Sequence, residues 1–103
     1  MFTPTEAYMV KVIAKNRNMM IPFYLMCCYS YYRANHPLVR DRFFDRLALA
    51  LSREFNYLDH YHKKFLTEEE VKAATFKGEY PSIMPSAVHS MRFRHVYPNG
   101  GLH

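Results

Sequence analysis

The apolar positions in the middle of the chain recur at steps of three and four, which is the pattern of an amphipathic α-helix. From Asp41 onward this stripe is formed by Phe44, Leu47, Leu51, Phe55 and Leu58. No stretch alternates apolar and polar residues for long enough to predict a strand. The pattern therefore predicts an all-α fold, a compact single-domain array of about four to five helices.

Two capping boxes predict where helices begin. Thr3 precedes Pro4 and stands three residues before Glu6, so Thr3 is expected to cap a helix that reaches about residue 18. Thr67 and Glu70 repeat the spacing and predict a second, short helix. The reciprocal bonds of a capping box satisfy backbone N–H groups that the first turn leaves without partners.

Proline, glycine and serine predict the remaining boundaries. Proline is tolerated in the first turn of a helix and disfavours helical geometry in the residue before it, so we expect a helix over 22–33 that Pro37 closes. Gly78 is placed to end the short helix in a left-handed conformation. Ser86 is expected to cap a last helix that reaches about residue 96.

Length and composition place the chain among folded single domains. Its 103 residues are 50% hydrophobic and 22% charged, close to the averages of globular proteins. We expect one domain over residues 1–97 and a frayed tail at 98–103. The net charge of +5 favours polyanionic partners such as nucleic acid or nucleotides, although a solvated basic surface explains it as well.

The cysteines and the apolar segments predict a cytoplasmic protein. Cys27 and Cys28 are adjacent, and on a helix their side chains diverge by about 100°, which fits a disulfide poorly. The apolar segment 19–32 is shorter than the ~20 residues of a membrane span and contains Pro22. No signal peptide is expected, because Lys11 interrupts the N-terminal apolar residues.

A group of aromatic and acidic residues surrounds the turn at Pro37. Tyr31 and Tyr32 precede it, and Asp41, Phe44 and Asp45 follow it. Aromatic faces and carboxylates together suit a flat cationic ring. The two aspartates are four apart on the predicted helix, where like charges repel, and a bound cation would remove that repulsion.

A purely structural interpretation explains the same residues. Asp41 can be the N-cap of the long helix, and Asp45 can pair with Arg42 or Arg46 on a solvated surface. The aromatic side chains can then belong to the core.

The spacing of residues 31–47 resembles the small N-terminal helical domain of NAD-dependent DNA ligases. In that family the domain recognises the nicotinamide mononucleotide (NMN) half of NAD. The resemblance extends over residues 24–58. It implies that NMN or NAD is held by Tyr31, Tyr32, Asp41, Phe44 and Asp45. To these five ligand-binding residues we add Arg40, which stands beside the turn, as a candidate partner of the phosphate.

Three positions depart from the ligase pattern. Phe44 stands where the ligases usually carry tyrosine, and Tyr32 stands where some carry histidine. Arg40 replaces a small residue beside the turn. A guanidinium there would oppose a cationic ring, or Arg40 or Arg42 would instead hold the phosphate of the nucleotide.

The ligase reaction is not expected of this chain. Members of the family form an adenylate on the lysine of a Lys-x-Asp-Gly motif, which is absent here. The resemblance therefore implies a non-catalytic protein for ligand capture, sensing or delivery. Residues 59–73 and 80–83 also look like small proteins of tailed bacteriophages, so we expect a phage protein in the host cytoplasm.

The competing interpretation is an interaction module that docks on a host protein or nucleic acid and uses the ligase-like helices as scaffold. A helix-turn-helix over 67–75 and 86–96 would present Arg92 and Arg94 to nucleic acid. Its connection is stretched by two prolines, Pro81 and Pro85, so the match is poor.

Two other kinds of site are not expected. His60 and His62 are two residues apart and do not share a helix face, so no metal is expected. Cys28 lies in an apolar stretch, where a thiol is usually an inert packing residue.

Overall fold

The computed structural model describes residues 1–96, with side chains through Arg92, and the expected tail at 98–103 lies outside these residues. The described part contains five α-helices, three short 3₁₀ turns and no strand, so the all-α prediction is confirmed. Its radius of gyration of 13.1 Å is that of a compact domain of this length. The helices are α1 (Pro4–Lys15), α2 (Met20–Tyr32), α3 (Asp41–Glu54), α4 (Glu68–Lys72) and α5 (Met84–Val96).

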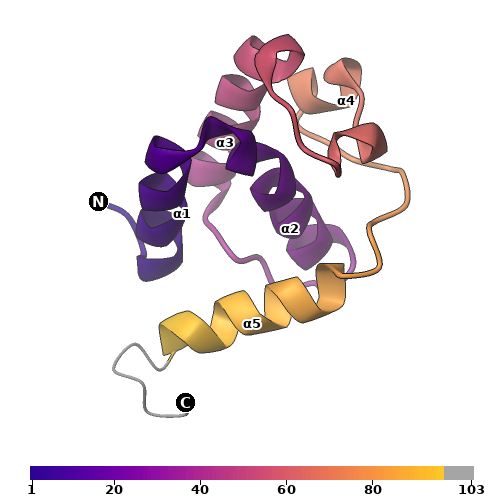
Figure 1. Ribbon diagram of the computed structural model, residues 1–103. Coiled ribbons are helices and arrows are strands. Elements are labelled where there is room, and N and C mark those ends of the chain that lie inside the picture. Colours follow the sequence, from indigo (N-terminus) through magenta and orange to yellow (C-terminus); the bar gives the residue numbers. More distant parts are fainter. Residues whose placement is uncertain (97–103) are drawn as a thin grey trace.

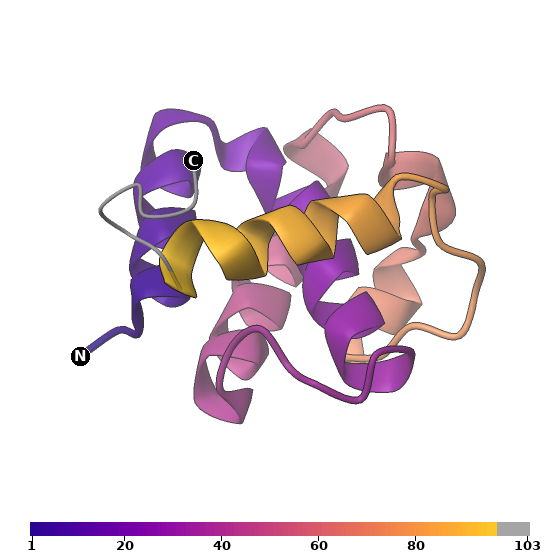
Figure 2. The same cartoon turned by 90° about the horizontal axis from the view of Figure 1, so that it is seen from below.

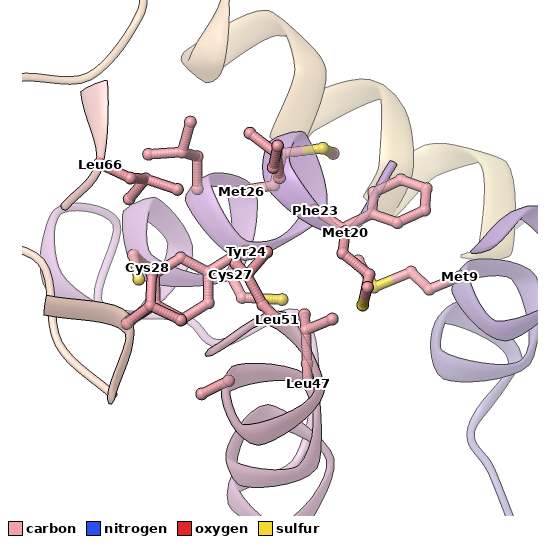
Figure 3. Packing of buried hydrophobic residues seen from close by; sticks show 14 of the residues in the cluster. Met9, Met20, Phe23, Tyr24, Met26, Cys27, Cys28, Leu47, Leu51 and Leu66 are labelled. Atoms are coloured by element: carbon pink, nitrogen blue, oxygen red, sulfur yellow. The ribbon is translucent and has the colours of Figure 1, made fainter. Parts of the chain in front are cut away.

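Helix α2 is the central element of the fold. It is apolar on all sides, and every residue from Met20 to Cys28 is buried, as expected of a helix surrounded by other elements. Helix α3 packs against α2, α5 crosses α2, and α4 lies on α3 (Figures 1 and 2). Figure 3 shows the side chains of α2 meeting those of α1 and α3 in the core, among them Met9, Tyr24 and Leu51.

The predicted start of α1 is confirmed, whereas its predicted end is wrong. The backbone N–H of Thr3 donates to Glu6 Oε1 at 3.0 Å, and the N–H of Glu6 donates to Thr3 Oγ1 at 3.2 Å. The helix ends at Lys15 rather than near residue 18, because the Asn16 side chain accepts from the N–H of Asn18 and starts a 3₁₀ turn. Side chains of this type compete with the helix for backbone groups.

Helices α2 and α3 lie close to where the sequence predicts them. Helix α2 begins at Met20, two residues before the predicted start. Pro22 falls in its first turn, where the missing N–H has no partner to lose. Helix α3 buries Leu47 and Leu51 as its stripe predicts, and a 3₁₀ turn over Phe55–Tyr57 extends it.

Two predicted boundaries in the C-terminal half are wrong. Helix α4 begins with the predicted capping box, but the left-handed residue that follows it is Ala74, with φ of 55°, and not Gly78. A Cβ at Gly78 would lie 3.1 Å from Cζ of Phe76, so this glycine permits a close approach of the ring. Helix α5 begins at Met84, whose N–H donates to the carbonyl of Pro81, so Ser86 is inside the helix and does not cap it.

Candidate functional site

A pocket of about 240 Å³ lies between the last turn of α2, the loop 33–40, the first turn of α3 and the end of α4. Its lining contains Tyr31, Tyr32, Asp41, Phe44 and Asp45. The structure therefore brings together five of the six ligand-binding residues predicted from the sequence. The remaining lining residues are Cys27, Ser30, Pro37, Leu38, Val39 and Ala74.

Ser30 fixes the loop that closes this pocket. Its side chain is buried, and Oγ donates to the carbonyl of Cys27 at 2.8 Å and accepts from the N–H of Leu38 at 3.0 Å. The Ser30 carbonyl accepts from the N–H of His36, and Asn35 takes a left-handed conformation with φ of 52°, which asparagine tolerates. The chain thus reverses within one loop, and the first turn of α3 faces the last turn of α2.

The tyrosines provide the open aromatic faces of the pocket. Tyr31 and Tyr32 are 53% and 47% exposed, and their rings meet edge to face with centroids 4.9 Å apart. The Phe44 ring is half-buried and stacks on Tyr24 at 5.3 Å, so one of its faces is already covered. Tyr32 is oriented by a contact of 3.4 Å between its hydroxyl and Thr75 Oγ1. A planar ligand would therefore stack on one of the two tyrosines.

The two aspartates have no ion-pair partner among the described residues. Asp41 is the first residue of α3, and the capping position belongs to Arg40 without a side-chain capping bond, so the prediction of Asp41 as N-cap is wrong. Neither Asp41 nor Asp45 forms an ion pair or a side-chain hydrogen bond within the described part of the chain, so the pairing of Asp45 with Arg42 or Arg46 is not found there. The pocket therefore presents two negative charges to a ligand.

Arg40 does not line the pocket, contrary to the prediction. Its guanidinium points to Glu6, with 2.7 Å between Nη2 and Glu6 Oε1, and its backbone N–H donates to Oε2 at 2.9 Å. Nη2 also donates to the carbonyl of Met1. A buried carboxylate requires a charged partner, which is the physical reason for this arrangement. Among the residues with described side chains, the lining contains no lysine, arginine or histidine.

The nucleic-acid prediction places Arg92 and Arg94 on a recognition helix, and the described contacts do not favour it. Arg92 is partly buried and donates to the carbonyl of His36, and burial lowers the pKa of its guanidinium. Helix α4 packs on α3 while α5 packs on α2 and α1, so α4 and α5 do not form the expected pair. The side chain of Arg94 lies outside the described residues.

The histidines between α3 and α4 form an aromatic cluster. His60 Nδ1 accepts from the N–H of His62, and the two ring centroids are 5.0 Å apart. Burial lowers the pKa of both imidazoles. In the part of the chain with described side chains, no three or more His, Cys, Asp or Glu residues are grouped as metal ligands.

The two thiols are buried and chemically quiet. Burial raises the pKa of Cys27, and it raises the pKa of Cys28 to about 12. A thiolate is therefore scarce at neutral pH, and neither side chain is poised as a nucleophile. Cys27 is nevertheless one of the residues that line the pocket.

Sequence reasoning missed the smaller lining residues. Cys27 precedes Tyr31 by four positions and so shares its helix face, a signal that was available in the spacing. Ala74 gave no signal, because only the packing of α4 against α3 brings it to the pocket.

Comparisons with protein-family models, curated proteins and solved structures gave no match to this chain. Within residues 1–96, no helix has both the length and the apolar character required to cross a membrane.

Proposed function

We propose that the pocket between α2 and α3 binds the positively charged nicotinamide ring of NMN or NAD, and that the protein is a non-catalytic binding protein. The observation that carries this proposal is the presence of Asp41 and Asp45 beside the open rings of Tyr31 and Tyr32 in one hollow. A cationic ring would gain both stacking and charge compensation there.

The size of the pocket favours the nicotinamide end of the ligand over the whole dinucleotide. Its volume of about 240 Å³ is below the roughly 300–1,000 Å³ of sites that enclose a drug-sized molecule. The adenosine half of NAD would therefore remain outside. Because none of the described side chains that line the pocket is basic, the phosphate of NMN would be solvated rather than paired with them.

The charge of the ring is the specificity determinant in this mechanism. Reduction of NAD to NADH removes the positive charge of the nicotinamide while the rest of the molecule is unchanged. Two carboxylates without cationic partners would then lose their electrostatic contribution to binding. The protein would distinguish the oxidised from the reduced cofactor without carrying out a redox step, as ligand capture, sensing or delivery requires.

The proposal places the protein in a reducing cytoplasmic compartment. Both cysteines are buried and free, which is the usual state of thiols there.

Calorimetric titration with NMN, NAD and NADH tests the proposal. We expect NMN and NAD to bind, NADH to bind at least about tenfold more weakly, and Asp45→Asn to weaken the binding of NMN. Asp59→Asn is the matched control, because Asp59 is exposed and lies outside the pocket lining. Equal affinity for NAD and NADH, or no heat with any of the three ligands, would refute the assignment.

A further inference from the structure

A second hollow of about 260 Å³ lies between α1 and α3, on a different face of α3 from the pocket between α2 and α3. Its floor is formed by core residues that are almost fully buried, Ile13, Met20 and Leu47. Apart from the two arginines at its rim, the rest of the lining is apolar and consists of Phe2, Val10, Ala14, Phe43 and Ala50. We call this hollow the α1–α3 groove.

Ion pairs hold the groove at both ends. Arg40 at the start of α3 pairs with Glu6 in the first turn of α1. At the other end, Arg17 just after α1 pairs with Glu54, the last residue of α3. Because one pair joins the two helix starts and the other lies at the two helix ends, α1 and α3 run in the same direction along the groove.

The rim of the groove is basic. Arg46 lines it directly, and Arg42 and Arg53 lie on the same side of α3 at helical spacing, together with the half-exposed Leu49. None of the three arginines forms an ion pair among the described side chains. The described residues of the lining include no acidic side chain, and the nearby Glu54 is already paired with Arg17.

We propose that the α1–α3 groove docks an amphipathic helix of a partner protein that carries acidic residues beside its apolar stripe. The lining covers residues 10–14 of α1 and 43–50 of α3, and the stretch of α3 corresponds to about two helical turns, or about 12 Å. Apolar side chains spaced at three, four and seven residues would enter the groove, as in other helix-in-groove complexes. Acidic side chains on the flank of that helix would meet Arg42, Arg46 and Arg53.

A synthetic helical peptide with leucines at this spacing and flanking glutamates is the probe that tests the proposal. The control probe is the same peptide with lysines in place of the glutamates. Binding is followed by fluorescence anisotropy of the labelled peptides, and the contact surface is mapped by amide chemical shifts of the full-length protein. We expect the glutamate peptide to bind at least about tenfold more tightly than the lysine peptide, with shifts concentrated at Val10, Ala14 and Ala50.

Charge reversal on the protein completes the test. Arg46→Glu should weaken the binding of the glutamate peptide at least about tenfold and should strengthen the binding of the lysine peptide. Lys77→Glu, an exposed position outside both hollows, changes the net charge equally and should leave both affinities unchanged. Circular dichroism of both variants verifies that the fold is kept.

Three outcomes would overturn the proposal. Equal affinity for the two peptides would show that charge does not contribute to recognition. Chemical-shift changes outside the groove would show that the peptide binds elsewhere. A concentration-dependent dimer in sedimentation that Arg46→Glu abolishes would assign the groove to a second copy of this chain.

Discussion

The Nη2 atom of Arg40 lies 2.7 Å from Oε1 of Glu6, and the Glu6 side chain is fully buried. The same carboxylate also accepts from the backbone N–H groups of Thr3 and Arg40. One residue thus completes the N-cap of α1 and joins it to the start of α3. Arg40, which we expected to meet the phosphate of the nucleotide, has a structural partner instead.

This pair predicts a specific loss of stability in acid. Burial alone would raise the pKa of Glu6, but the hydrogen bonds from Arg40 and Thr3 outweigh it and lower the pKa from 4.5 to about 2. Because the pKa is depressed in the folded state, the stabilisation is present above pH 4.5 and is lost as the pH falls to about 2. The expected decrease in the free energy of unfolding is about 2–3 kcal/mol over this interval.

Thermal and urea unfolding between pH 7 and pH 2 measure this decrease. Glu6→Gln should be less stable than the native protein at pH 7 by about 1–3 kcal/mol, because it loses a charged hydrogen-bond acceptor. It should also lose most of the pH dependence below 4.5. Parallel pH profiles for the two proteins would show that another group controls acid unfolding.

Asp45→Asn should change stability and ligand binding in opposite directions. Asp41 and Asp45 are four residues apart on α3 without other charged partners in the described chain, so removing one charge should stabilise the free protein by a few tenths of a kcal/mol. If the proposed function holds, the same change should weaken NMN binding by about 1–3 kcal/mol. Urea unfolding and calorimetry on one preparation measure both effects.

The matched variant for this experiment is Asp41→Asn. Asp41 is in the first turn of α3, where a negative charge interacts favourably with the helix dipole. If the proposed function holds, Asp41→Asn should therefore weaken the binding of NMN, and it should not increase the free energy of unfolding. A stability gain equal to that of Asp45→Asn would contradict this account of the two carboxylates.

Ala74→Gly should stabilise the protein. Ala74 follows α4 with a φ of 55°, a conformation that glycine adopts without the steric cost that a Cβ imposes. We expect a gain of about 0.5–1 kcal/mol, measured as an increase in the midpoint of urea unfolding with an unchanged slope. Gly78→Ala is the contrasting variant and should destabilise, because its Cβ would press on the Phe76 ring.

The buried thiols should report unfolding. Cys27 and Cys28 are inaccessible, and burial raises the pKa of both, so neither should react with a thiol reagent in the native protein at pH 8. Both should react promptly in concentrated urea. Rapid modification of either cysteine under native conditions would show that α2 opens locally.

The helices were largely predictable because their signals are local. The capping boxes at Thr3 and Thr67 and the apolar stripe of α3 are properties of a few neighbouring residues, and the structure contains each of them. Helix ends were less predictable. Asn16 ends α1 through its own side chain, and Ala74 takes the conformation that the sequence assigns to Gly78.

The residue types of the candidate site, and most of the predicted residues that line it, could be inferred from the sequence. Tyr31, Tyr32, Asp41, Phe44 and Asp45 flank one short loop, so any fold that reverses the chain at Pro37 brings them together. The surroundings of Phe44 could not be predicted, because its stacking on Tyr24 depends on how α3 packs against α2.

The residues alone predicted the helical class, the starts of α1 and α4 and most of the residues around the pocket, because spacing along one chain specifies the face of a helix. The partner of Arg40, the place of Ala74 in the pocket and the α1–α3 groove follow from how the helices pack. These depend on contacts between residues that are far apart in the sequence. Such contacts arise only when whole helices pack, and no local pattern in the sequence encodes which charged group a buried carboxylate will meet.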